Sequence, residues 1–417
     1  MKRMLSLLLS LALILTLAAI PASAGDSPTI VKLLAISGNG GHDTIAKTFN
    51  ETHSDIQIEL DNTASSWEDA STKLITLIAA NMPPDITTVS TSYYPQFAAQ
   101  GLLLDITDFT EANLPEDEYY WSVIDGLRRD GRLYGLPISV YTLVNYYNKD
   151  MFAAAGVEPP SLDWKNTWTM EQWHDSGLKL SSGEGLNRIY GAFIEYQLER
   201  TATFLFPEGL DYWGEDLKPQ FDDPSIREIH EYLYKMVHDE KIIPDSATTK
   251  TTSVTQMFAD GKLAQMIVGT WSHPDIALSD IQYGVTPTPG GVSVGYVDVY
   301  IPVASTPHVE ATLEVLKYLV GEEASTIKYQ EYTWGPQINK AATQKNIDIM
   351  FAGLTPDEKQ CIFDSLDNCK PLTVFDKWAE FLSASLLPAS EMMSIGEYTV
   401  DEGFDQLQEE ANDLLGY

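Results

Sequence analysis

Basic residues are scarce in this chain, and their scarcity excludes two classes of partner. The 417 residues include 26 Lys and Arg against 60 Asp and Glu, which gives a formal net charge of −34. Binding to nucleic acid without regard to its sequence needs a basic surface that displaces counterions from phosphates. Adhesion to an anionic membrane surface needs the same positive charge. We therefore expect no nucleic acid and no anionic lipid surface among the partners.

Long apolar runs are absent beyond the N-terminus. Lys2 and Arg3 precede an apolar stretch over residues 4–20, and the small residues 22–24 allow cleavage. This order is typical of a secretory signal peptide, so residues 1–24 are interpreted as one. A membrane anchor is the alternative, although the run is at the short limit for a span. No cysteine stands at the cleavage point, so we expect an exported protein, periplasmic or extracellular, without a lipid anchor.

Cysteine is nearly absent too. Cys361 and Cys369 are the only two in the sequence, and an even pair in an exported chain is a candidate disulfide. We predict a bridge between them, with two unpaired thiols as the alternative. Neither has a histidine near it in sequence, so neither is interpreted as a nucleophile.

Motifs that carry metals, nucleotides or catalysis are missing as well. The 7 histidines form no His-Glu-x-x-His pattern and no zinc pattern with cysteine. The Gly-rich stretch 38–41 lacks the spacing of the nucleotide-binding loops. Residues 291–295 match the turn around a hydrolase nucleophile, but a strand-like segment follows Ser293 where that turn needs a helix. We therefore expect no metal, no cofactor and no catalytic residue.

Strand and helix patterns alternate along the chain. An apolar, β-branched run at 30–36 is followed by a Gly-rich loop and by a helix that Asp43 can cap. Alternation at 56–60 predicts the next strand, and a helical stripe follows at 74–78. This order is typical of an α/β fold with a mostly parallel sheet covered by helices on both faces.

Two later helices have clear starts. Thr169 with Gln172, and Thr399 with Glu402, have the spacing of capping boxes. Residues 143–147 predict a further strand between these regions and the N-terminal part. No internal repeat and no long flexible linker interrupts the order.

Aromatic residues are plentiful, and many lie in predicted loops. The chain has 9 Trp and 21 Tyr, and several stand beside Gly, Pro, Ser or Asn, among them Trp67, Tyr93, Trp271 and Trp334. A pyranose has an apolar face and a rim of hydroxyls, so flat rings with polar tips suit a sugar site. The alternative for each ring is that it fills a core.

Six short motifs follow one another through the mature chain. They are residues 82–86 (MPPDI), 101–107 (GLLLDIT), 130–137 (DGRLYGLP), 146–150 (YYNKD), 257–262 (MFADGK) and 269–271 (GTW). In these motifs, behind an export signal, the chain resembles the extracellular solute-binding proteins of carbohydrate ABC transporters, the maltose-binding-protein-like family 1. The resemblance covers nearly the whole mature chain.

The resemblance implies a two-lobed α/β fold of the type II periplasmic-binding-protein-like class, with hinge crossings between the lobes. The N-terminal lobe would comprise residues 25–139 and 299–332. The C-terminal lobe would comprise residues 140–298 and 333–417.

We place the hinge crossings near 139–142, 294–298 and 332–336. The resemblance further implies a monomer that binds a mono- or oligosaccharide between its lobes and then docks on a membrane permease of an ABC transporter. The ligand would act by stabilising the closed arrangement, without catalysis.

The same resemblance assigns ligand contacts residue by residue. Trp271 would stack on the sugar, and Tyr141 would hydrogen-bond to it. Ser92 and Tyr93 stand where the family has a charged pair that grips hydroxyls, a departure that disfavours maltodextrin itself. The remaining assignments are Glu195 and Tyr196 in a loop of the second lobe, Trp378 in the C-terminal helices, and, from loop or hinge position alone, Asn39, His42, Trp67, Tyr296, Asp298 and Trp334.

Three alternatives stay open. For His42, an exposed place at the start of a helix is the simpler interpretation. The same fold could bind a polyamine or another small solute, given the acidic charge. A secreted carbohydrate-active enzyme that uses two of the acids is the third, and turnover of a glycoside would distinguish it from a receptor.

Overall fold

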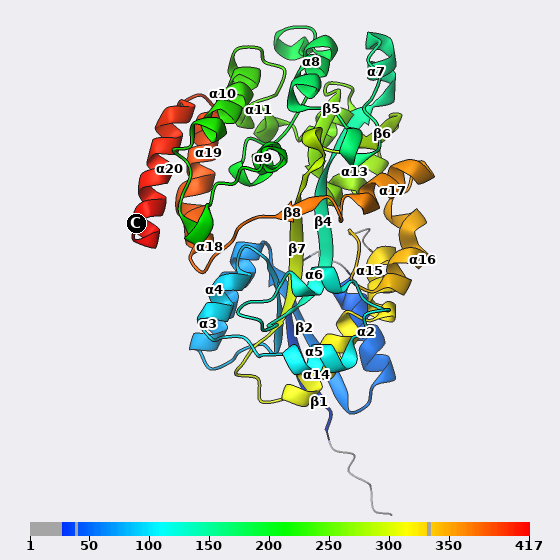
Figure 1. The fold of residues 1–417 in the computed structure, drawn as a ribbon. Coiled ribbons are helices and arrows are strands. Elements are labelled where there is room, and N and C mark those ends of the chain that lie inside the picture. Colours follow the sequence, from blue (N-terminus) through cyan, green and yellow to red (C-terminus); the bar gives the residue numbers. More distant parts are fainter. Residues whose placement is uncertain (1–26, 38–40, 332–334) are drawn as a thin grey trace, which may run out of the picture.

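Two α/β lobes joined by long strands make up the molecule (Figure 1). The computed structural model describes residues 27–37, 41–331 and 335–417. The predicted signal peptide, Asn39 and Trp334 lie outside these ranges. Within them, no helix has the length and the apolar character needed to cross a membrane.

The first lobe is built around strands from the N-terminal part of the chain. The first strand pairs in parallel with the second on one side and with the third on the other. Helices pack their apolar sides against these strands, as the spacing of the buried residues requires. The elements are β1 (Thr29–Ile36), α2 (His42–Thr52), β2 (Ile56–Ala64), α3 (Trp67–Ala79), β3 (Ile86–Ser90), α4 (Tyr94–Ala99), α5 (Thr107–Asn113) and α6 (Trp121–Asp125).

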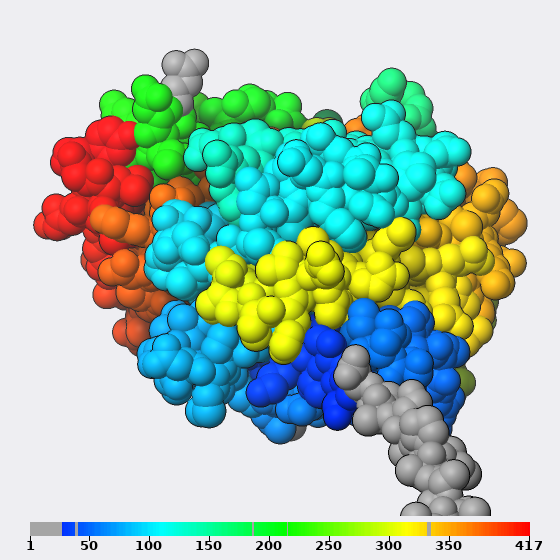
Figure 2. All heavy atoms as spheres, turned by 90° about the horizontal axis from the view of Figure 1, so that it is seen from below, coloured from blue at the N-terminus to red at the C-terminus, as the bar shows by residue number. Residues whose placement is uncertain are grey.

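The chain returns to the first lobe after passing through the second. Figure 2 shows, from below, a segment in yellow lying between the N-terminal segment in blue and a segment in cyan. The yellow segment contains α14 (Val309–Leu319), whose Val315, Leu316 and Leu319 are fully buried in the first core. Residues far apart in sequence therefore build this lobe.

The second lobe is richer in helices. Its strands are β5 (Gln265–Gly269) and β6 (Tyr283–Thr286), and β8 (Cys369–Pro371) pairs with the long strand β7 (Ser293–Pro302). Its α-helices are α7 (Lys149–Ala155), α8 (Met170–Leu180), α9 (Leu198–Leu205), α10 (Pro224–His238), α11 (Ser246–Thr251), α12 (Val254–Ala259), α13 (His273–Ala277), α16 (Lys340–Met350), α17 (Pro356–Asp364), α18 (Trp378–Phe381), α19 (Leu387–Ser394) and α20 (Val400–Leu415). Shorter helical turns are η1 (Trp164–Asn166), η2 (Gly185–Asn187), η3 (Phe206–Glu208), η4 (Glu215–Leu217), η5 (Thr270–Ser272), η6 (Pro289–Gly291) and η7 (Leu382–Leu386).

Two strands run through both lobes. β4 (Leu136–Asn148) pairs with β7 over residues 136–142 and with β5 and β6 over residues 143–148. β7 pairs with β4 over residues 295–300 and with β3 over residues 298–302. The crossings predicted near 139–142 and 294–298 are therefore confirmed. Of the third predicted crossing, only residues 335 and 336 are described.

The sheet is mixed, so the prediction of a mostly parallel sheet is wrong: β1 pairs in parallel with β2 and β3, and β7 with β8, but the strand pairs that join the lobes are antiparallel. The described strands form one eight-stranded sheet, and β7 runs antiparallel to both β3 and β4. β5 and β6 also run antiparallel to β4. The reason is the path of the chain: β4 leaves the first lobe and β7 comes back, so the two must point in opposite directions.

Each lobe has a hydrophobic core of its own. The first core contains Phe49 and Phe97, and the second contains Trp173 and Phe258. The segment around α15 (Glu322–Glu331) contributes to both, because Tyr329 packs in the second core and Ile338 in the first.

A tight turn before β4 explains the motif at residues 130–137. Asp130 and Gly131 both have a positive φ, 50° and 77°. The flanking Arg129 and Arg132 exchange backbone hydrogen bonds of 2.9 Å. Two central residues with positive φ make a type I′ hairpin turn, which an Asp-Gly pair favours.

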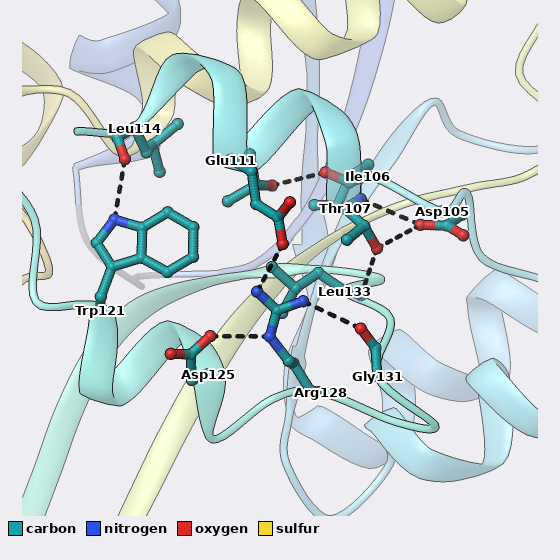
Figure 3. A network of polar contacts seen from close by, with 11 residues as sticks. Asp105, Ile106, Thr107, Glu111, Leu114, Trp121, Asp125, Arg128, Gly131 and Leu133 are labelled. Carbon is teal, nitrogen blue, oxygen red and sulfur yellow. Dashed lines mark hydrogen bonds and ion pairs between the residues drawn. The ribbon is translucent and has the colours of Figure 1, made fainter. Parts of the chain in front are cut away.

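Arg128 holds this turn in place (Figure 3). Its guanidinium donates to the Gly131 carbonyl oxygen at 3.0 Å. It also pairs with the Asp125 and Glu111 carboxylates at 2.8 and 2.9 Å. The turn and its ion pairs fix the point at which β4 begins its path toward the second lobe.

The helix starts test the capping predictions. Thr169 and Thr399 both cap their helices in complete capping boxes, as predicted. Asp43 does not cap α2, because Gly41 in a left-handed conformation occupies that position. The Asp43 carboxylate instead accepts a hydrogen bond of 2.9 Å from the Asn62 side chain.

Ser293 has a structural place at the start of β7. It is fully buried, and its Oγ donates to the Leu143 carbonyl oxygen at 2.7 Å. The same Oγ accepts from the Leu143 backbone N–H at 2.8 Å. Both bonds tie β7 to β4 where the strands pass between the lobes.

The predicted disulfide is not formed, which corrects the prediction for Cys361 and Cys369. Both thiols are free. Cys361 faces the second core from α17, whereas Cys369 opens β8, where its Sγ lies beside Gly295 of β7. Burial raises the pKa of Cys361 to about 12 and that of Cys369 to about 11, so neither is a reactive thiolate at neutral pH.

Candidate ligand site

One strand carries polar and aromatic side chains along one face. Tyr296, Asp298 and Tyr300 alternate along β7, and alternate residues of a strand share a face. Val297 and Val299 point to the other face and pack against the first core. We call Tyr296, Asp298 and Tyr300 the β7 row. Because β7 crosses between the lobes, Tyr296 and Asp298 lie at their junction, whereas Tyr300 is fully buried in the first core.

Three rings meet at the upper end of the β7 row. Tyr141 stands opposite Tyr296 in the pairing of β4 with β7. The ring of Trp271 meets Tyr141 edge-on at 5.7 Å and Tyr296 edge-on at 5.4 Å. We call Tyr141, Trp271 and Tyr296 the aromatic cluster. A Cβ at Gly269 would lie 2.2 Å from the Trp271 ring, so the glycine of the GTW motif gives this ring its place.

Arg200 lies over two rings of the aromatic cluster. Its guanidinium carbon is 4.9 Å from the ring centroid of Trp271 and 4.5 Å from that of Tyr296. It forms an ion pair of 3.7 Å with Glu195. Burial alone would lower the pKa of Arg200, but Tyr296, Glu199 and Glu195 outweigh it and raise the pKa. The site therefore contains a permanent cation with its charge compensated by neighbouring acids.

Glu199 adds an acid beside this cation. Burial raises its pKa, although the attraction of Arg200 acts in the opposite direction. The hydroxyl of Tyr296 donates to the Glu199 backbone carbonyl at 3.1 Å, which joins α9 to β7. Burial likewise raises the pKa of Tyr296, to about 12, so its hydroxyl keeps its proton at neutral pH.

Ser92 and Tyr93 reach the same junction from the first lobe. The residue before them donates its backbone N–H to the Val297 carbonyl oxygen at 3.1 Å. Burial raises the pKa of Tyr93, and the carboxylates of Glu68 and Glu199 raise it further. Since Glu199 belongs to α9 of the second lobe, its effect on Tyr93 acts between the lobes.

Asp298 is a buried acid in the middle of the β7 row. It is 8% exposed and lies opposite Ser90 on β3 and Ser139 on β4. No residue in the described ranges forms a hydrogen bond or an ion pair with its carboxyl group. Burial raises the pKa of Asp298 to about 8, so the carboxyl is mostly protonated at pH 7.

The structure places Trp378 and Tyr196 in the second core, apart from the aromatic cluster. Trp378 is 2% exposed and packs edge-on against Phe375 at 5.7 Å. Tyr196 is 6% exposed, and its hydroxyl donates to the His230 carbonyl oxygen at 3.4 Å. With Glu195, Tyr196 also lines a groove of about 540 Å³ bordered by α11 and α19.

His42 and Trp67 lie in the first lobe. His42 is buried, and its Nε2 is 2.8 Å from the Tyr300 hydroxyl at the lower end of the β7 row. The simpler interpretation of His42 as an exposed helix-start residue is therefore wrong. Trp67 begins α3 and is half-buried against Ile36 and Ala64.

Sequence reasoning missed Arg200 and Glu199. The sequence could have drawn attention to Arg200, because no other Lys or Arg occurs between Arg188 and Lys218. A lone base beside Glu195 and Glu199, in a chain short of bases, points to a specific ion pair. Nothing local predicts that the guanidinium lies over Trp271, which is far away in sequence.

Metal binding finds no support in this site. Across residues 27–37, 41–331 and 335–417, no three His, Cys, Asp or Glu side chains gather closely enough to hold an ion. The acids near Arg200 instead compensate its positive charge.

Comparison with known proteins identifies the family. Residues 42–326, which extend through both lobes, match the family of bacterial extracellular solute-binding proteins. The chain belongs to this family. A putative binding protein of Brucella abortus (strain 2308) is 23% identical to this solute-binding protein over 314 residues, covering 70% of this chain and 73% of the relative. The arabinooligosaccharide-binding protein of Bacillus subtilis (strain 168) is 26% identical over 259 residues, or 58% and 57% of the two chains.

Solved structures show the same fold for this solute-binding protein. An ABC substrate-binding protein from Listeria monocytogenes, in complex with cycloalternan, superimposes with a TM-score of 0.82. The two are 22% identical, and the match covers 94% of this chain and 100% of that one. The prediction of a two-lobed, type II periplasmic-binding-protein-like fold is confirmed.

Proposed function

We propose that this solute-binding protein takes up a mono- or oligosaccharide between its lobes and delivers it to the permease of an ABC importer. In this proposal it acts as a monomer, outside the cytoplasmic membrane and without a lipid anchor, and leaves the sugar chemically unchanged. The observation that carries the proposal is the aromatic cluster, because it lies where the two crossing strands pass between the lobes.

The chemistry of the junction suits a sugar. Aromatic rings provide flat apolar surface for the C–H face of a pyranose. Arg200, Glu195 and Glu199 provide donors and acceptors for its hydroxyls. The names of two relatives, an arabinooligosaccharide-binding protein and a protein solved with cycloalternan, agree with such a ligand.

Groups from both lobes face the junction, so a bound ligand can favour closure of the two lobes around it. A ligand that touches Tyr93 of the first lobe and Trp271 of the second would bind the closed arrangement better than an open one. Closure would move residues 25–139 and 299–332 against residues 140–298 and 333–417, the boundaries predicted from sequence. β4 and β7 would bend where they cross.

A thermal unfolding screen of residues 25–417 tests the ligand class. The probes are maltotriose, arabinotriose, mannobiose and spermidine, each at rising concentration. A ligand at 100 times its Kd adds about 2.7 kcal/mol to stability. Stabilisation by a saccharide that is recovered unchanged supports the proposal. Degradation of the saccharide would show an enzyme, and stabilisation by spermidine alone would overturn the sugar assignment.

Replacing Trp271 by alanine tests the site itself. We expect the Kd of the best saccharide from the screen to rise at least about fivefold, since an aromatic anchor contributes more than about 1 kcal/mol. Trp168→Ala is the matched control, because Trp168 stacks on Phe152 in the second lobe and contacts no member of the aromatic cluster in the described ranges. Isothermal titration calorimetry measures both. An affinity of Trp271→Ala within about twofold of the parent protein would contradict the stacking role.

A further inference from the structure

The β7 row runs from a ring cluster at one end to a buried histidine at the other. Tyr296 belongs to the aromatic cluster, and Tyr300 is 2.8 Å from His42 Nε2. Asp298 stands between the two tyrosines on the same face of the strand. A ligand that reaches along this face from the aromatic cluster toward the first lobe therefore meets Asp298, since Tyr300 beyond it is fully buried.

Asp298 is 8% exposed, and within the described ranges its carboxyl has no protein partner. The nearest polar residues on the neighbouring strands are Ser90 and Ser139. Ser139 Oγ accepts a hydrogen bond of 2.6 Å from Gln337 and forms none with Asp298. A ligand that covers this carboxyl removes it from water, which costs about 1 to 3 kcal/mol unless the ligand itself exchanges a hydrogen bond with it.

We propose that Asp298 determines the specificity of the site by exchanging hydrogen bonds with the hydroxyl groups of an uncharged sugar. This inference rests on the proposed function and names the side chain that distinguishes one ligand from another. A protonated carboxyl both donates and accepts, as a sugar hydroxyl does, so the two are matched in both directions.

The state of the Asp298 carboxyl argues for an uncharged ligand at this place. Asp298 is 8% exposed, and no residue in the described ranges forms an ion pair with it. Burial raises its pKa to about 8, so the carboxyl is mostly neutral at pH 7 and does not attract a cation. The two bases beside the β7 row, Arg200 over Tyr296 and Lys328 at 4.9 Å from the ring centroid of Tyr300, add little. Glu195 and Glu199 compensate Arg200, and burial lowers the pKa of Lys328 to about 7.

Two variants of residues 25–417 test the inference by calorimetry with the saccharide that best stabilises the parent protein. Asp298→Leu has nearly the same shape but exchanges no hydrogen bond, and we expect its Kd to rise at least tenfold, equal to about 1.4 kcal/mol. Asp298→Asn keeps one donor and one acceptor, and we expect its Kd to stay within about threefold of the parent value. Asp163→Asn, at an exposed helix cap of the second lobe, is the control and should leave the Kd unchanged.

The outcomes separate this inference from the proposed function. If no saccharide binds the parent protein, the proposed function fails and the inference fails with it. If the parent protein binds but Asp298→Leu binds equally well, only the inference is overturned. If Asp298→Asn is as weak as Asp298→Leu, or if spermidine binds the parent protein and not Asp298→Asn, the site needs a negative charge and the role of a neutral carboxyl is wrong. Should the leucine variant not fold, Asp298→Ala is measured in its place.

Discussion

Asp298→Asn is expected to stabilise the ligand-free protein increasingly as the pH rises from 4 to 8. Burial raises the pKa of Asp298 from 3.8 to about 8, so the folded protein keeps a proton that the unfolded chain releases. Unfolding therefore releases a proton throughout this window, and the free energy of unfolding falls as the pH rises. Asparagine carries no such proton, and its side chain has nearly the same shape.

The magnitude follows from the two pKa values. Each pH step between them changes stability by about 1.4 kcal/mol, so the interval from 3.8 to pH 7 corresponds to about 4 kcal/mol. The stability difference between Asp298→Asn and the parent protein should grow by that amount between pH 4 and pH 7. Above pH 8 it should stop growing, because the folded protein then releases its proton as well.

Urea unfolding of both proteins at pH 4, 5.5, 7 and 8.5 provides the measurement. The other ionisable groups near Asp298 are Tyr296 and Tyr300 on its own strand, Tyr141 on β4, His42 on α2 and Lys328 on α15. Both proteins contain all of them, so their titration cancels in the difference as long as Asp298 stays protonated. Burial lowers the pKa of Lys328 to about 7, so the comparison that decides is the one from pH 4 to pH 7.

A second buried aspartate provides a control. Asp85 is 4% exposed, but its carboxylate accepts hydrogen bonds from the Lys32 backbone N–H and from the Thr306 hydroxyl. Asp85→Asn should destabilise the protein by about 1 to 3 kcal/mol, since an amide cannot accept at both atoms. A constant difference between Asp298→Asn and the parent protein from pH 4 to pH 7 would refute the reasoning, because it would mean that Asp298 is ionised in the folded state.

Two further results are expected. Arg200→Met should lower the free energy of unfolding by about 1 to 3 kcal/mol in urea titrations, because it leaves Glu195 and the half-buried Glu199 without their counter-charge; unchanged stability would mean that solvent already screens these acids. Cys361 and Cys369 should both react with a thiol reagent in denaturant without prior reduction, and a reductant should not shift the melting temperature; fewer than two reactive thiols would show that a bridge forms in solution.

Local patterns predicted much of the fold. The capping boxes at Thr169 and Thr399 depend on residues three positions apart, and both are present as predicted. The crossing near 139–142 was expected from the family resemblance, but the turn before it contains the Asp130-Gly131 pair, which favours a type I′ turn by itself. Such features depend on short-range sterics and hydrogen bonds, which a single sequence contains.

Features that depend on pairing between distant segments were not predictable in the same way. The antiparallel direction of β7 follows from the return of the chain to the first lobe, and no residue near β7 encodes it. The disulfide prediction failed for the same reason, since α17 points Cys361 into a core while Cys369 starts a strand. The contact of Arg200 with Trp271 joins two segments about seventy residues apart in sequence.

Trp271 and Trp378 also show that the local sequence does not decide where a tryptophan side chain lies in the fold. The family resemblance assigned both to the ligand, yet Trp271 lies at the junction and Trp378 is 2% exposed in a core. The difference is that Trp271 follows a glycine against which its ring packs at the end of β5, whereas Trp378 begins a short helix among Phe375, Phe381 and Trp213. An aromatic side chain is equally suited to both environments, so only the path of the backbone decides between them.

β7 connects the stability of the molecule with its proposed binding function. Its valine face is buried in the first core, while its other face presents Tyr296 and Asp298 at the junction between the lobes. A bend of the strand during closure would therefore move the binding groups and the hinge together. An unpartnered Asp298 makes the ligand-free junction less stable than it could be, and a sugar hydroxyl that meets the carboxyl removes that cost only when the ligand is in place. Asp298 would then lower the stability of the ligand-free protein and, through its hydrogen bond to the ligand, stabilise the closed arrangement.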